Sequence, residues 1–108
     1  MGFIKNSDIQ METVAPGMTR QIMGYDSELM LVVVNFEKVG IGAKHSHPHQ
    51  QVSYVVSGAF EVEIDGKKEV LGKGDAFVVP SNAEHGAICL DAGVLIDTFS
   101  TLREDFLK

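Results

Sequence analysis

Short segments of alternating apolar and polar residues, most of them bounded by glycine or proline, limit the fold of this chain more than any other feature. In residues 59–65, Phe60, Val62 and Ile64 alternate with two glutamates, and the Asp65-Gly66 pair is a strong hairpin signal. Such alternation is typical of strands, and no comparable helical period is present. Turn signals recur about every eight to twelve residues, as in sandwiches and barrels. The pattern therefore predicts an all-β fold.

The same pattern predicts nine strands and one short helix. The expected strands span residues 19–25, 29–36, 38–42, 51–57, 59–65, 67–71, 76–79, 85–90 and 94–100. Thr101, followed three residues later by Glu104, matches a capping box, so a short C-terminal helix is expected over 101–107. The chain has 108 residues and shows no linker or repeat, so we expect a single domain over residues 1–108.

Composition argues against several classes of partner. The net charge is −6 and the largest basic cluster is the pair Lys67-Lys68, so no nucleic-acid partner is expected. No apolar run approaches the ~20 residues that cross a bilayer, so no membrane association is expected. The single cysteine rules out an internal disulfide, and the first residues lack the features of a secretory signal. We therefore expect a cytoplasmic protein.

An anionic ligand would need a local cation, because the overall charge of the protein repels it. The chain has two arginines, Arg20 and Arg103. Arg20 has two interpretations, a second cation at the mouth of a cavity or an exposed strand residue, and the second is favoured.

The histidines are concentrated in two places and predict a metal site. Three of the four lie within residues 45–51, and the fourth is His85. On a strand, His45 and His47 project to one face, and Gln51 has the same parity. His85 opens a later strand and can complete the set across a small barrel. Neutral imidazoles and an amide leave the ion its full charge, which favours Lewis-acid chemistry. His49 is expected to support a ligand or to lie at the rim, rather than to be a ligand itself.

The spacing of these residues resembles the two motifs of the cupin superfamily. The segment 40–58, with its two histidines and Gly58, resembles the first motif, and the segment 74–89, with Pro80 and His85, resembles the second. The resemblance implies a double-stranded β-helix, a jelly-roll-like barrel. It also implies one divalent transition metal ion (Ni, Zn, Fe or Mn) bound by His45, His47, Gln51 and His85. The alternative is a metal-free cupin in which the histidines are surface or packed residues.

Residues 97–103 form a second informative segment. Asp97 and Phe99 share strand parity, so both can face a cavity, and Arg103 can reach back over its opening. An acid, an aromatic ring and an arginine beside a metal suit a small anionic sugar. The arginine would clamp a carboxylate, the ring would pack on the sugar, and the aspartate could move a proton. Alternatively, Asp97 bonds a histidine ligand, Phe99 is core packing, and Arg103 pairs with a neighbouring acid.

This C-terminal segment, together with residues 24–36, resembles the KdgF-type pectin-degradation cupins. That group converts 4,5-unsaturated uronate monosaccharides from pectin or alginate into linear 5-keto-4-deoxyuronate. The resemblance implies catalytic roles for Asp97 and Arg103 and substrate-binding roles for Phe99 and Arg103. Related cupins often pair through their outer strands, so a homodimer is expected. Two alternatives stay open: a non-catalytic sugar- or metal-sensing cupin, and a small metal-dependent dioxygenase. Gln51, where a glutamate is usual, weakens the latter.

Overall fold

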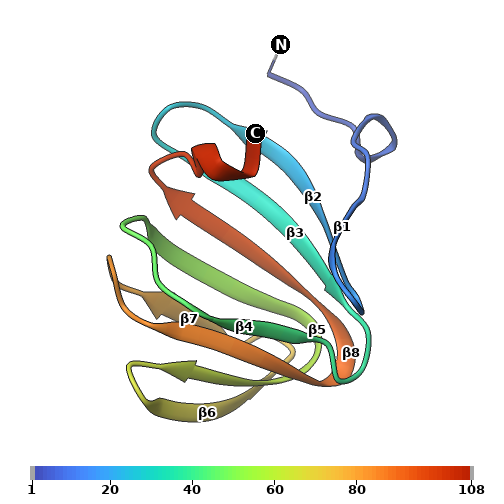
Figure 1. The fold of residues 1–108 in the computed structure, drawn as a ribbon. Coiled ribbons are helices and arrows are strands. Elements are labelled where there is room, and N and C mark those ends of the chain that lie inside the picture. Colours follow the sequence, from blue (N-terminus) through green and yellow to red (C-terminus); the bar gives the residue numbers. More distant parts are fainter. Residues whose placement is uncertain (1, 108) are drawn as a thin grey trace.

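The computed structural model describes residues 2–107 and confirms an all-β fold (Figure 1). The elements in chain order are η1 (Asn6–Asp8), β1 (Glu12–Ala15), β2 (Met18–Tyr25), β3 (Met30–Phe36), β4 (Ile41–His45), β5 (Gln50–Ile64), β6 (Lys67–Gly72), β7 (Ala76–Val79), β8 (His85–Ser100) and η2 (Glu104–Leu107). Within the described range, no helix is long and apolar enough to cross a membrane.

Two long antiparallel strands, β5 and β8, organise the fold. They pair from Gln50–Ser100 at one end to Ile64–His85 at the other, and both belong to two layers. In the first layer the strands run in the order β1-β2-β3-β8-β5, with β7 beside β5. In the second layer β4 pairs with the first half of β8, and β6 pairs with the second half of β5. Figure 1 shows both long ribbons curving between the layers, as in the expected double-stranded β-helix.

Two glycines permit the bend shared by β5 and β8. Gly58 has a φ of +83°, and a Cβ on it would lie 2.5 Å from the carbonyl oxygen of Asp91. A Cβ on Gly93 would lie 2.1 Å from the carbonyl oxygen of Ser57. Because no side chain fits at either position, only glycine lets the two backbones cross this closely. The bend turns the inner faces of the two layers toward each other.

The inward-facing residues of both layers form the core. Phe36 and Phe60 pack edge-to-face with ring centroids 5.1 Å apart, and Val55, Val62 and Leu95 are buried around them. Burial of each such side chain stabilises the fold by about 1.5–3 kcal/mol. The core continues along the first layer to Met30 and Phe99, and Phe99 is the register partner of Gln51.

Several predicted elements differ from the structure. The segments 51–57 and 59–65 are one bent strand, as are 85–90 and 94–100, because the bends keep their hydrogen bonds. The strand predicted at 38–42 begins at Ile41, since Val39 has a φ of +63° and belongs to a turn. The short strand β1 and the turn η1 were not predicted from the sequence.

The predicted C-terminal helix over 101–107 is wrong in type and length. Residues Glu104–Leu107 form a 3₁₀ turn, in which the Phe106 amide bonds the Arg103 carbonyl. Leu102 and Phe106 both pack against the core. The capping-box pattern marks the start of a helical turn but not its type or length, so it did not separate a 3₁₀ turn from an α-helix.

Candidate metal centre and its cavity

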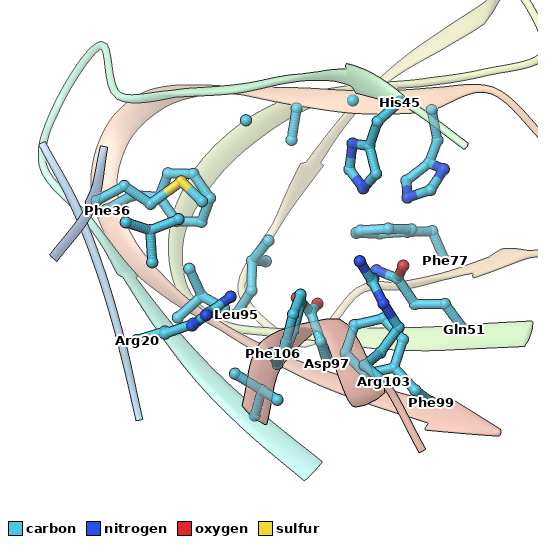
Figure 2. Close-up of a pocket in the computed structure, with 18 residues that line it drawn as sticks. Arg20, Phe36, His45, Gln51, Phe77, Leu95, Asp97, Phe99, Arg103 and Phe106 are labelled. Carbon is cyan, nitrogen blue, oxygen red and sulfur yellow. The ribbon is translucent and has the colours of Figure 1, made fainter. Parts of the chain in front are cut away.

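A cavity of about 200 Å³ lies between the two layers. Its polar end is lined by residues that the sequence analysis singled out: His45, Gln51, His85, Asp97, Phe99 and Arg103. Its other end is apolar and includes Val32, Val34, Phe36 and Leu95. Figure 2 shows the polar side chains converging from several elements. The structure therefore brings together residues that are up to 58 positions apart in the sequence, His45 and Arg103.

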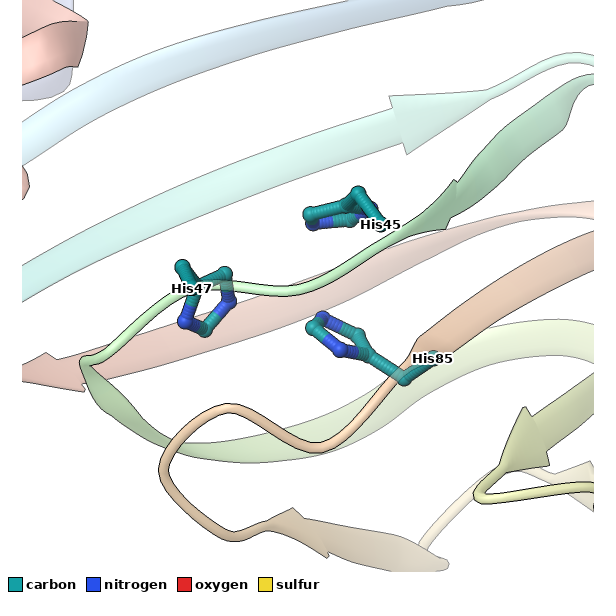
Figure 3. Close-up of side chains that lie close together, drawn as sticks. All are labelled: His45, His47 and His85. Atoms are coloured by element: carbon teal, nitrogen blue, oxygen red, sulfur yellow. The ribbon is translucent and has the colours of Figure 1, made fainter.

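Three histidines meet at the polar end (Figure 3). His45 is the last residue of β4, His47 lies two residues further on, and His85 opens β8 as the register partner of His45. One ring nitrogen from each lies within 4.8 Å of the others. His47 and His85 are buried, whereas His45 is exposed on the cavity side. The convergence predicted from the spacing of the histidines is confirmed.

Backbone carbonyls select the same tautomer in all three rings. The Nδ1 atoms of His45, His47 and His85 lie 2.8, 2.9 and 2.9 Å from carbonyl oxygens. A carbonyl only accepts, so each Nδ1 carries the hydrogen and each Nε2 keeps a lone pair in the neutral ring. The buried Nε2 of His85 has no hydrogen-bond partner among the described residues. Three Nε2 lone pairs are thus free to bind one cation.

Gln51 places a potential fourth donor atom beside the three histidines. Its Oε1 lies 3.1 Å from Nε2 of His47, so two acceptors face each other, an arrangement that a shared cation stabilises. The amide nitrogen of Gln51 donates to Oγ of Ser53 at 2.9 Å. Ser53 in turn donates to Oδ1 of Asp97 at 2.5 Å. Because the only hydroxyl hydrogen of Ser53 goes to Asp97, the serine accepts from Gln51, and this keeps the amide oxygen turned toward the histidines.

The electrostatics favour metal binding at neutral pH. Burial is the main cause that lowers the pKa of His47 and of His85, and the charge of Arg103 lowers both further. Neutral imidazole is the metal-binding form. Three nitrogens and one amide oxygen fit a divalent transition ion such as Ni, Zn, Fe or Mn, and do not single out one of them.

Asp97 is a buried acid on the cavity wall. Burial raises its pKa to about 6, against the opposing effects of the Ser53 hydrogen bond and the Arg103 charge. In the sequence analysis, one alternative for Asp97 was a direct bond to a histidine ligand. The structure places its carboxylate against Ser53 instead. An acid with this pKa is present in both protonation states near neutral pH and can move a proton.

Phe99 and Arg103 line the cavity and also make structural contacts. The Phe99 ring is buried and lies edge-on to His47, with centroids 5.8 Å apart. Arg103 is 7% exposed and forms a two-point ion pair with Asp105, with distances of 3.0 and 2.8 Å. The pair with a neighbouring acid was one alternative for this arginine, and the structure contains it. It does not remove Arg103 from the cavity, whose wall the side chain still forms.

His49 and Arg20 differ in how well their sequence interpretations hold. His49 is partly buried and is not part of the histidine cluster, and its carbonyl accepts a hydrogen bond from His47, so the contact that it makes is a supporting one. The expectation that Arg20 is an exposed strand residue is wrong. Its side chain is 18% exposed and lines the cavity, because the inward parity of β2 directs it between the layers.

Sequence reasoning gave no role in this site to several residues, among them Ser53 and Phe106. Ser53 is two positions from Gln51 and is the register partner of Asp97. Its parity with Gln51 was a usable signal, but the partnership with Asp97 depends on the β5–β8 register. Phe106 lines the cavity from η2, whereas the predicted helix had given it no role.

Comparison with known proteins agrees with this fold. A family model described as a cupin domain matches residues 32–99. The pectin degradation protein KdgF of Dickeya dadantii is 46% identical over 98 residues, which cover 89% of each chain. Among solved structures, an RmlC-like cupin from Shewanella frigidimarina has a TM-score of 0.95 and 46% identity, over 98% of this chain and 96% of that one. KdgF from Halomonas sp. has a TM-score of 0.93 and 42% identity over 98% of both chains. The chain therefore belongs to the cupin family, within which it resembles the KdgF pectin degradation proteins.

Proposed function

We propose that this protein is a metal-dependent enzyme of pectin breakdown. Its substrate would be a 4,5-unsaturated uronate monosaccharide, from pectin or alginate, and its product the linear 5-keto-4-deoxyuronate. The similarity to KdgF over most of the chain supports the role in pectin breakdown. The observation that carries the reaction is the meeting of three histidines and Gln51 with a buried acid and a buried arginine in one cavity. The ligand set has no carboxylate, which disfavours an oxygenase.

The reaction is an isomerisation, so its atoms balance without a co-reactant. The hemiacetal hydroxyl at C1 loses its proton, the bond between C1 and the ring oxygen breaks, and an aldehyde and an enolate form. The enolate then becomes a ketone when the same proton is added at C4. When bound, a divalent ion would supply Lewis-acid stabilisation of negative charge on a substrate oxygen.

Asp97 would be the group that moves the proton. Its pKa of about 6 leaves it largely ionised at neutral pH, so it can accept the hydroxyl proton. The same carboxyl can then deliver that proton to C4. The hydrogen bond from Ser53 holds one of its oxygens and directs the other toward the cavity.

Arg103 and Phe99 would bind and orient the sugar. The guanidinium of Arg103 lies 5.1 Å from the Phe99 ring centroid and is held through Nε and one Nη by Asp105. Its remaining N–H groups can donate to substrate oxygens and stabilise charge on the ring oxygen as the ring opens. The Phe99 ring would pack against the apolar side of the sugar and exclude water.

A direct assay tests this proposal. The protein is incubated with a 4,5-unsaturated uronate, and the absorbance of the conjugated double bond is followed, with Asp97→Asn as the control. Loss of absorbance by the wild-type protein, faster than the spontaneous loss, supports the enzyme. Binding without turnover would indicate a sensing protein, and oxygen uptake coupled to turnover would indicate a dioxygenase; either result contradicts the proposal.

A further inference from the structure

Two arginines lie on the same aromatic ring in the cavity. The Cζ of Arg20, from β2, is 4.0 Å from the centroid of the Phe106 ring, and the Cζ of Arg103 is 4.2 Å from it. Figure 2 shows Phe106 between the two side chains, with Arg103 on the side of the metal centre and Arg20 toward the apolar end. The two guanidinium groups therefore border different parts of the cavity.

The two arginines differ in how fully their charge is compensated. Arg103 has the two-point ion pair with Asp105 at 3.0 and 2.8 Å. Arg20 has one long ion pair, in which its Nη2 lies 3.7 Å from Oε2 of the half-exposed Glu12. The buried Nε of Arg20 has no hydrogen-bond partner among the described residues. A partly buried guanidinium with an unfilled donor is unfavourable, and an anionic ligand that accepts from this donor would remove the penalty.

We propose that Arg20 binds the carboxylate of the sugar and determines the preference of the site for uronates over neutral sugars. The inference rests on the proposed function and deepens it. The positive charge of Arg20 is less fully neutralised by neighbouring carboxylates than that of Arg103. A substrate carboxylate can accept two hydrogen bonds from the N–H groups of its guanidinium. The anomeric end of the sugar then points to the histidines, where Asp97 and Arg103 border the cavity. Arg103 acts on the reacting oxygens rather than on the carboxylate.

Equilibrium binding tests this assignment without relying on turnover. The metal-loaded wild-type protein is titrated calorimetrically with D-galacturonate and with D-galactose, its neutral counterpart. The wild-type protein should prefer the uronate at least tenfold. Arg20→Gln should remove most of that preference, and Arg20→Lys should restore part of it. Arg103→Gln should keep the preference while it loses turnover.

A second variant keeps the inference testable if Arg20→Gln fails to fold. Glu12 is half exposed and has no proposed catalytic role, and Glu12→Gln leaves Arg20 less compensated. It should bind galacturonate a few-fold more tightly, with galactose binding unchanged; unchanged or weaker galacturonate binding would overturn the assignment. Loss of the uronate preference in Arg103→Gln but not in Arg20→Gln would also overturn it. If the uronate is bound selectively through Arg20 but never converted, the proposed function fails and this inference stands.

Discussion

Ser53 donates its hydroxyl hydrogen to Asp97 at 2.5 Å, and the two residues are register partners on β5 and β8. The same hydroxyl oxygen accepts a hydrogen from the amide of Gln51 at 2.9 Å. A single buried oxygen atom thus links the acid of the cavity to the amide that is the proposed fourth ligand of the metal centre. Groups that orient a ligand in this way commonly change metal affinity by about 10–100-fold when they are removed.

Ser53→Ala should weaken metal binding by about tenfold or more. Without the serine, the Gln51 amide can rotate so that its NH₂ group donates a hydrogen bond to Nε2 of His47, which competes with the ion. Competition with a coloured chelator measures the affinity. Thr98→Val is a matched control, because the Thr98 hydroxyl bonds the Val52 carbonyl on the outer side of the sheet. Equal affinity in Ser53→Ala and the wild-type protein would show that the serine does not orient the amide.

Asp97→Asn should abolish most turnover, by about 10²–10⁴-fold, and should also stabilise the metal-free protein at neutral pH. Burial raises the folded-state pKa of Asp97 to about 6, above its usual 3.8. Protonated Asp97 therefore contributes fully to the free energy of unfolding below about pH 4, and this contribution is lost as the pH rises through about 6. Asp97→Asn has no ionisable group here and does not lose this stability. Its free energy of unfolding in urea, relative to that of the wild-type protein, should therefore rise by about 2–3 kcal/mol between pH 4 and pH 7.5. A stability difference between the two proteins that stays constant or falls over this pH range would contradict the burial of the Asp97 charge.

Arg103→Ala should lower turnover by about 10²-fold while leaving the metal content intact. The guanidinium borders the reacting end of the cavity but is not a metal ligand. Asp105→Asn should produce a smaller loss, because it removes the ion pair that orients Arg103 without removing the cation. Glu104→Gln, one residue away, is the control. Elemental analysis and the absorbance assay together measure the outcome, and full activity in Arg103→Ala would remove it from the site.

Much of this site could be predicted from the sequence because strand parity is a local property. A spacing of two residues places His45 and His47 on one face of the chain, and Asp97 and Phe99 on one face of their strand. The resemblance to the cupin motifs then predicted that these separate segments form one site. The Ser53–Asp97 and Arg20–Phe106 contacts depend on register and curvature. Register and curvature are determined by residues that are far apart in the chain, so no local sequence pattern predicts them. Arg20 was misjudged for this reason: its parity permitted either face, and only the β2–β3 pairing settles which one is inside.

The outer surface of the first layer is uncharged and partly apolar, and we expect two copies of the chain to pair through it. Leu31, Thr98, Val52 and Val78 form one row across four strands, and Tyr54 lies beside it, partly exposed. Among the described residues, the outward side chains of β3, β5, β7 and β8 in this layer carry no formal charge. In a chain of net charge −6, such a face is the one on which two copies can meet without repulsion.

Sedimentation should therefore give the mass of a dimer for the wild-type protein at micromolar concentration. Val52→Lys should shift the population to monomer, because it places two charges in the interface. Val70→Lys is the control: Val70 is also exposed, at 61%, but lies on β6, beside Glu61 on the charged outer side of the second layer. A wild-type monomer, or equal effects of the two lysines, would contradict the dimer.

The central claim is that an ion held by His45, His47, His85 and Gln51 is required for ring opening. Its most direct test is the rate of absorbance loss from the unsaturated uronate, measured before chelation, after chelation, and after return of one equivalent of a divalent transition ion. Chelation should lower this rate at least a hundredfold, and return of the metal should restore it. A protein shown by elemental analysis to be free of metal, yet converting the sugar at the full rate, would contradict it.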